Sequence, residues 1–110
     1  RSAASTRYGA ITVAVRQAVT TAGMCEVGDV LGLLDGDIVE IADSFEAAGK
    51  GIVRRMLDGG GELLTLVSGE ESTAELISAI TDEAEELRPE IEIEVVPGGQ
   101  PLWPLIFGIE

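Results

Sequence analysis

The chain ends in PGGQPLWPLIFGIE, residues 97–110, where a turn-rich segment runs directly into an apolar one. Glycine permits backbone angles that other residues avoid, while proline fixes its own and has no N–H to donate. The alternation of the two predicts a stiff, shaped loop, and the apolar residues after it predict a strand over 105–109. Because this strand is continuously apolar, we expect it to lie between two other strands.

Two amphipathic helices are predicted upstream of this segment. In the first, over 44–57, apolar residues recur at spacings of three and four, and Asp43 or Ser44 is placed to cap the first turn. The second spans 72–87, carries an acidic outer face and stops before a proline. The glycine run at 59–61 indicates the end of the first helix and a connector after it.

Strand patterns fill most of the remaining chain. Asp35-Gly36 between two apolar runs predicts a hairpin, because a type I′ turn needs positive φ at both central residues. Elsewhere the signal is period-two alternation or β-branched residues. The predicted strands are 10–16, 29–34, 37–41, 62–67, 91–95 and 105–109, with a loop over 20–28.

Six strands and two helices predict an α+β fold: a two-layer sandwich with a mixed six-stranded sheet and both helices on one face. The other face, which carries Glu92 and Glu94, must then meet water or another domain. Residues 1–9 read as a polar linker and 10–110 as a single domain. Since no methionine precedes Met24, we expect a fragment of a larger multidomain protein.

The composition limits the class of partner. Apolar residues make up 45% of the 110 residues, enough for one core, but aromatics are only 4%, so that core must be aliphatic. A net charge of −13 argues against nucleic acid and anionic membranes, and favours solubility or a basic partner surface. No apolar run approaches the roughly 20 residues of a membrane span, so no membrane insertion is expected. The single cysteine suits a reducing, cytoplasmic location.

Several motifs could be taken as chemical sites, but each has a simpler structural interpretation. Cys25 has no histidine to activate it and reads as a packed or spare thiol. The DGD at 35–37 lacks the further ligands of a calcium loop, and the acidic run at 82–86 reads as a solvated helix face. The glycines at 59–61 and 98–99 precede strands, whereas a phosphate-binding loop opens a helix. We therefore assign no catalytic, cofactor-binding or metal-ligating residue.

The loop before the last strand holds the candidate interface. Trp103 between two prolines is either a packing plug or an anchor at a protein interface, where tryptophan is enriched. We expect this loop to contact a neighbouring subdomain or a partner. The candidate interface residues are Gly98, Gly99, Gln100, Pro101, Trp103 and Pro104.

Two segments together resemble one family. VGDVLGLLDGDIV at 27–39 and VVPGGQPLWPLIFGIE at 95–110 are similar to the C-terminal end of the bacterial fatty acid kinase catalytic-chain family, also called DAK2-domain or Dak phosphatase proteins. The resemblance runs from residue 10 to the end of the chain. The common family form has tyrosine where this chain has Trp103.

The resemblance implies a place in a longer protein. Members carry an ATP-binding kinase domain, a middle domain and a DegV-like C-terminal region, and this chain corresponds to the second half of that region. It implies a mixed six-stranded sheet with helices on one face and, counting strands along the chain, the order 3-2-1-4-5-6. ATP- and magnesium-binding residues lie in the N-terminal domain, so no catalytic residue carries over to this chain.

The family phosphorylates the carboxyl group of a fatty acid held by a separate DegV-type carrier. The resemblance thus implies a non-catalytic subdomain of a kinase that docks the carrier or assembles with the remaining domains of its own chain. The alternatives are a DegV-like module that binds a fatty acid itself, and part of a dihydroxyacetone-kinase-like protein. A domain apart from its other half exposes apolar surface, so a homo-oligomer is a further expectation.

Overall fold

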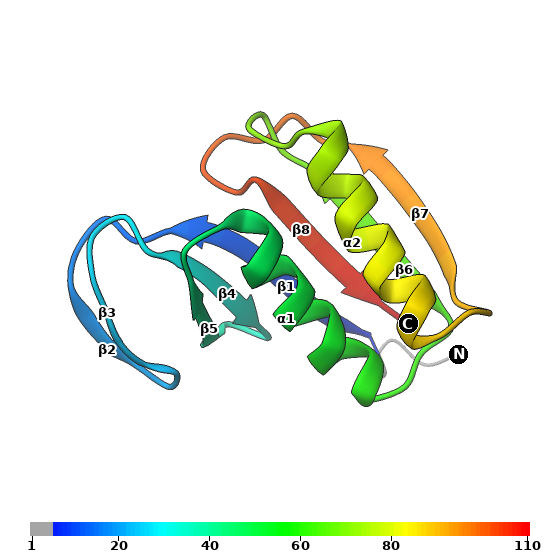
Figure 1. The fold of residues 1–110 in the computed structure, drawn as a ribbon, viewed down its shortest axis with the longest axis horizontal. Helices are drawn as coiled ribbons and strands as arrows, with labels where there is room; N and C mark the ends of the chain where they lie inside the picture. Colours follow the sequence, from blue (N-terminus) through cyan, green and yellow to red (C-terminus); the bar gives the residue numbers. More distant parts are fainter. Residues whose placement is uncertain (1–5) are drawn as a thin grey trace.

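The computed structural model describes residues 6–110 and has the predicted α+β fold, with a six-stranded mixed sheet and two helices on one face (Figure 1). The sheet order is β5-β4-β1-β8-β6-β7; β6 and β7 are parallel and the other neighbours antiparallel. A two-stranded sheet, β2-β3, stands apart from it. The elements are β1 (Arg7–Val13), β2 (Ala18–Thr20), β3 (Gly23–Cys25), β4 (Val30–Leu34), β5 (Asp37–Ala42), α1 (Phe45–Asp58), β6 (Leu63–Ser68), α2 (Ala74–Leu87), β7 (Glu92–Pro97) and β8 (Leu105–Ile109).

The β4–β5 hairpin turns at the predicted dipeptide. Asp35 has a φ of 52° and Gly36 a φ of 91°, the positive values that a type I′ turn requires. The Asp35 N–H donates to the Tyr8 carbonyl oxygen at 2.8 Å and ties the turn to β1. The hairpin prediction is confirmed to the residue.

Both helices begin at hydroxyl caps. The Ser44 hydroxyl accepts a hydrogen bond from the backbone N–H three residues on, and the Thr73 hydroxyl does the same for α2, each at 3.1 Å. Of the two candidate caps for α1, Ser44 is thus the one used, and Gly59 ends the helix as predicted. These caps satisfy N–H groups that the first helical turn leaves free.

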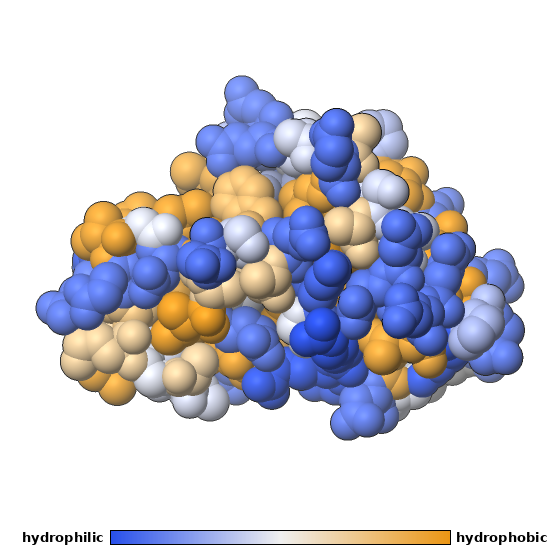
Figure 2. Space-filling view, in the orientation of Figure 1, coloured by the Kyte–Doolittle hydropathy of each residue, from blue (hydrophilic) through white to orange (hydrophobic). Residues whose placement is uncertain are grey.

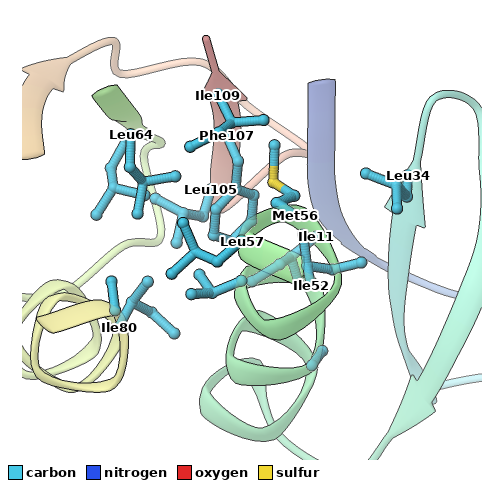
Figure 3. Packing of buried hydrophobic residues seen from close by; sticks show 14 of the residues in the cluster. Ile11, Leu34, Ile52, Met56, Leu57, Leu64, Ile80, Leu105, Phe107 and Ile109 are labelled. Carbon is cyan, nitrogen blue, oxygen red and sulfur yellow. The ribbon is translucent and has the colours of Figure 1, made fainter. Parts of the chain in front are cut away.

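The core lies between the helices and the sheet (Figure 3). Ile52 and Met56 of α1 and Ile80 of α2 meet Leu64 and Phe107 of the sheet, and all five side chains are fully buried. The α1 helix approaches β1 and β4 closely because both strands carry a glycine beneath it. A methyl group at either Gly9 or Gly32 would stand within 2.9 Å of the Ile52 side chain.

The last strand is central. β8 lies between β1 and β6, which confirms the expectation from its continuous apolarity. Counted along the chain, the six sheet strands run 3-2-1-6-4-5, so the order 3-2-1-4-5-6 implied by the resemblance is wrong in its second half. The reason is that β6, α2 and β7 form a parallel crossover unit, and β8 then returns antiparallel into the gap between β6 and β1.

Residues 18–25 form a hairpin arm in place of the predicted loop. β2 and β3 pair antiparallel, and the arm extends beyond the β5 edge of the main sheet (Figure 1). The base of the arm is fixed by a small buried cluster of Ala14, Cys25 and Leu31. An N–H of the arm turn, that of Ala22, also donates to the Ile38 carbonyl oxygen of β5 at 3.1 Å.

The first strand starts earlier than predicted. β1 spans Arg7–Val13 where the sequence indicated 10–16, so residues 7–9 of the expected linker are strand. They pair with both β4 and β8, which lengthens β1 at the end where the sequence is not periodic. Residues 1–5 of that linker lie outside the described part of the chain.

Candidate functional site

The β7–β8 loop is held against the β6–α2 connection by backbone hydrogen bonds. The N–H groups of Gly98 and Gly99 both donate to the Ser68 carbonyl oxygen, and the Gly69 N–H donates to that of Pro104, each at 2.9 Å. A methyl group on Gly69 would lie 2.2 Å from the Trp103 carbonyl oxygen, so the two segments touch through bare backbone. The loop is therefore rigid, as its glycines and prolines predicted.

The side chains of the loop divide into those that hold it and those that face outward. Gln100 is half-buried and its amide donates to the carbonyl oxygens of Val67 and Trp103, at 3.2 and 2.9 Å. Pro104 is buried, whereas Trp103 is half-buried and borders two hollows. Leu102, which was not among the predicted interface residues, is 78% exposed. The remaining candidate residues, Gly98, Gly99 and Pro101, are exposed.

The sheet face opposite the helices, which we call the open face, carries an apolar row across all six strands. Side chains alternate along a strand, so Ala10 and Ile106 point away from the helices because Ile11 and Phe107 beside them are buried under the helices. Every member of the row is half-buried or exposed. In strand order from β5 to β7 the row is Ile38, Leu33, Ala10, Ile106, Val67 and Val96.

Three hollows lie along this face. The largest, about 720 Å³, runs between the hairpin arm and the β7–β8 loop, and we call it the arm groove. A second, about 520 Å³, lies over Gly108 and we call it the Gly108 hollow. A third, about 260 Å³, lies between Tyr8, Leu33 and Trp103. The arm groove is lined mainly by apolar residues, including Ala14, Cys25, Leu31, Ile38, Leu102 and Trp103.

Charge is unevenly distributed over the two faces. On the helix side Arg54 pairs with Glu83 at 2.8 Å and Arg55 with Glu40 at 2.7 Å. Arg88 donates to the backbone oxygens of Leu57 and Gly61. Seen from this side, most of the helical part is hydrophilic, and hydrophobic surface gathers toward the hairpin arm (Figure 2).

Arg16 is the exception among the basic residues. Arg7 and Lys50 are also paired, with Asp35 and Glu46 at 3.0 Å each, so within residues 6–110 the guanidinium of Arg16 alone has no partner. Arg16 is exposed and lines the arm groove, with Glu71 as the other charged residue of its lining. The groove thus combines apolar walls with one free cation.

One carboxyl group has a shifted pKa. The Tyr8 backbone N–H donates to one oxygen of Asp35 at 3.1 Å, and the Arg7 guanidinium donates to the other at 3.0 Å. Both contacts favour the ionised form, so they hold the pKa of Asp35 below its ordinary value of 3.8 despite a small opposing effect of burial. This carboxylate therefore closes the β4–β5 turn onto β1.

The other motifs have structural roles. Cys25 is buried and its thiol donates weakly to the Arg16 carbonyl oxygen at 3.8 Å. The glycines at 59–61 follow α1 and lead into β6, so they do not form a phosphate cradle at a helix start. Within residues 6–110, no three His, Cys, Asp or Glu side chains gather so as to hold a metal ion. Residues of this part do not fit ATP or magnesium, and no chemical step is assigned to them.

No helix in the described part of the chain has the length and apolarity needed to cross a membrane.

The loop was predicted from the sequence, but the surface beside it was not. Ala10 and Ile106 of the open face lie in strands whose apolar residues were all assigned to the core. A signal was present, because β4 (VLGLL) and β8 (LIFGI) are apolar on both faces, as in sheets with cover on both sides. The continuous apolarity was used to place β8 inside the sheet but not to infer a second buried face.

Comparison with known proteins places the chain in a family. A family model for FakA-like proteins, which describes the C-terminal part of a fatty acid kinase, matches residues 1–110. An uncharacterized protein of Staphylococcus epidermidis is 34% identical over 104 residues, which cover 93% of this chain and 18% of that protein. Protein YloV of Bacillus subtilis is 28% identical over 104 residues, 94% of this chain and 19% of YloV.

A further relative, an uncharacterized protein of Staphylococcus haemolyticus, is 28% identical over 106 residues, 96% of this chain and 19% of that protein. The chain thus spans about a fifth of the length of the relatives it matches. Because the family model covers all 110 residues, the chain belongs to the FakA-like C-terminal family of fatty acid kinases.

Proposed function

We propose that this chain is a non-catalytic domain of a fatty acid kinase that docks a DegV-type fatty-acid carrier. The observation that carries the proposal is the apolar row on the open face, which no helix of residues 6–110 covers. A large exposed apolar surface on a folded domain marks a site of protein interaction. Phosphoryl transfer itself belongs to other parts of the whole protein.

The charge of the chain supports a protein partner of a particular kind. With a net charge of −13, the domain attracts basic surfaces and repels anionic ones, which raises the rate of encounter with a basic partner. The rigid β7–β8 loop adds a fixed border with Leu102 exposed at its tip. A rigid surface loses little conformational entropy on docking, so the same contact area gives a higher affinity.

The test is a binding measurement with the whole kinase protein. This protein and a variant that lacks residues 1–110 are compared for binding to the purified carrier by isothermal titration calorimetry. We expect the truncated protein to lose carrier binding. Unchanged binding by a truncated protein that remains folded would contradict the docking role.

A second candidate function, binding of a fatty acid by this domain itself, is favoured by the arm groove. The groove offers about 720 Å³ between largely apolar walls, with the free guanidinium of Arg16 available for a carboxylate. Apolar pockets with few polar groups at the rim are typical lipid sites. Organic extraction of the purified protein followed by mass spectrometry tests this, and we expect less bound fatty acid in Arg16→Gln. Absence of any fatty acid in the wild-type extract would reject it.

A further inference from the structure

Gly108 is an unusual residue for the middle of a central strand. Glycine in a strand interior weakens the strand, and it marks a bulge or a place where another molecule approaches closely. The pairing of β8 with β1 and β6 is regular through Gly108, so no bulge explains the residue. A methyl group built on Gly108 would meet nothing within 4 Å. The backbone at this point of the open face is therefore bare.

The hollow over Gly108 has walls of defined chemistry. Across the sheet, Gly108 is paired with Tyr8 of β1 and with Thr65 of β6. The Tyr8 side chain is 62% exposed, so its ring is available as a wall. Ile106 and Val67 of the apolar row complete the lining on one side. The space suits a long aliphatic side chain laid along an aromatic ring.

The acidic groups around this hollow have no cation of their own. Glu94 stands opposite Thr65 and so lies two strands from Gly108, about 10 Å away. Glu110 lines the hollow and points to the same face two residues along β8. Neither carboxylate makes an ion pair within residues 6–110, whereas the acids on the helix side include paired ones such as Glu83.

We infer that the open face around Gly108 docks a partner protein that presents an apolar strip with an arginine beside it. The strip covers Ala10, Ile106 and Val67, and the arginine enters the Gly108 hollow. Its stem lies against Tyr8 and its guanidinium reaches the carboxylates of Glu94 and Glu110. Arginine fits better than lysine because its planar group stacks on an aromatic ring and binds carboxylates with two parallel hydrogen bonds.

A second copy of this chain fits this surface less well. Face-to-face pairing would bring together two domains that each carry a net charge of −13. The groups nearest the hollow, Glu94 and Glu110, would then face a surface whose free carboxylates match their own sign. A basic partner removes this repulsion and pairs the same groups.

The inference rests on the proposed docking function, and the experiment separates the two. The probe is the purified DegV-type carrier, titrated into the whole kinase protein with and without residues 1–110 and into two point variants. Gly108→Gln fills the hollow without a steric clash in the fold, since the space above the glycine is empty. Glu94→Lys reverses one of the free carboxylates.

Matched controls place the same changes on the far side of the molecule. Ser78→Gln adds similar bulk, and Glu85→Lys reverses a charge, both on α2 and away from the open face. We expect Gly108→Gln and Glu94→Lys each to weaken carrier binding about tenfold or more, and the controls to change it less than about twofold. Thermal melts of all variants show whether each protein is folded.

Each outcome bears on a different proposal. Loss of binding on truncation together with weakening by both point variants supports the inference. Loss on truncation with wild-type affinity in both variants overturns the inference and leaves the docking function standing. Binding that survives truncation overturns both. If the wild-type protein is a dimer in light scattering, Gly108→Gln makes it a monomer and carrier affinity is unchanged, the occupant is a second copy and the inference is wrong.

Discussion

The two faces of the central sheet are built from neighbouring residues but have opposite environments. Under the helices, Ile11, Leu64 and Phe107 are completely buried. On the open face, one residue away in the same strands, Ala10 and Ile106 remain partly exposed. The difference lies in what covers the strands and not in the strands themselves, because both faces carry an apolar row.

This comparison separates stability from recognition. Burial of apolar surface contributes about 25 cal/mol per Å², so the helix-covered face supplies most of the folding free energy. The open face has the same apolar character but keeps part of that free energy unrealised until a partner covers it. Substitutions on the two faces should therefore separate cleanly, the first set affecting unfolding and the second set affecting binding.

The largest effect is expected at Phe107. Phe107→Ala leaves a cavity in the core and should lower the free energy of unfolding by about 3–5 kcal/mol, measured by urea denaturation of the isolated chain. Its neighbour Ile106→Ala, on the open face, should cost only about 1–2 kcal/mol, because the side chain is already partly in water. Equal losses in the two variants would mean that the faces do not differ as described.

A smaller effect is expected at the rim of the open face. Gly69→Ala places a methyl group 2.2 Å from the Trp103 carbonyl oxygen, so the β7–β8 loop must move. Overpacking of this kind costs about 1–3 kcal/mol. Trp103 is the only tryptophan, so its fluorescence reports on the loop directly, and we expect its emission to shift to longer wavelength. An unchanged spectrum and melting temperature would show that the loop tolerates the methyl group.

Local patterns predicted most elements because local physics determines them. Asp35-Gly36 needed only its own φ values to set the β4–β5 turn, and the apolar spacing and glycine stop defined α1. The order of strands depends on which elements pair over long distances, and here the apolarity of β8 was a better guide than family analogy. The hairpin arm was missed because three-residue strands give almost no periodic signal.

The candidate site was predicted only in part. Glycines and prolines identified the rigid loop, but not that Gln100 and Pro104 face inward, because inward packing depends on the β6–α2 connection. The open face depends on the absence of a third layer over residues 6–110, and no single strand encodes that. Gly108 is the clearest case, since an empty space above a glycine appears only when strands far apart in sequence are assembled.

The opposite sign is expected for a methyl group on the open face. Gly108→Ala should raise the free energy of unfolding of the isolated chain by about 0.5–1 kcal/mol, because alanine loses less backbone entropy than glycine and meets no atom within 4 Å. The melting temperature of the two proteins checks this. Together with Gly69→Ala, the variant contrasts a filled and an empty position in one molecule. Destabilisation by Gly108→Ala would indicate that the open face is already covered in solution.

The smallest effect is expected where both faces meet at the β4–β5 turn. Asp35 contacts the side chain of Arg7 and the backbone of Tyr8, and both contacts lower its pKa. A carboxyl group with a lowered pKa stabilises the fold above its ordinary value of 3.8, and this contribution is lost as the pH falls through the folded pKa. Asp35→Asn keeps a residue that tolerates positive φ but removes the charge.

We therefore expect Asp35→Asn to be less stable than wild type at pH 7 by a few tenths of a kcal/mol, since the side chains of the pair are 39% and 46% exposed and screened by water. The gap between the two proteins should close below about pH 4. Urea midpoints from pH 7 to pH 3 measure it, with Glu85→Gln on the exposed side of α2 as the matched control. A gap that stays constant over this range would show that Asp35 acts through turn geometry and not through its charge.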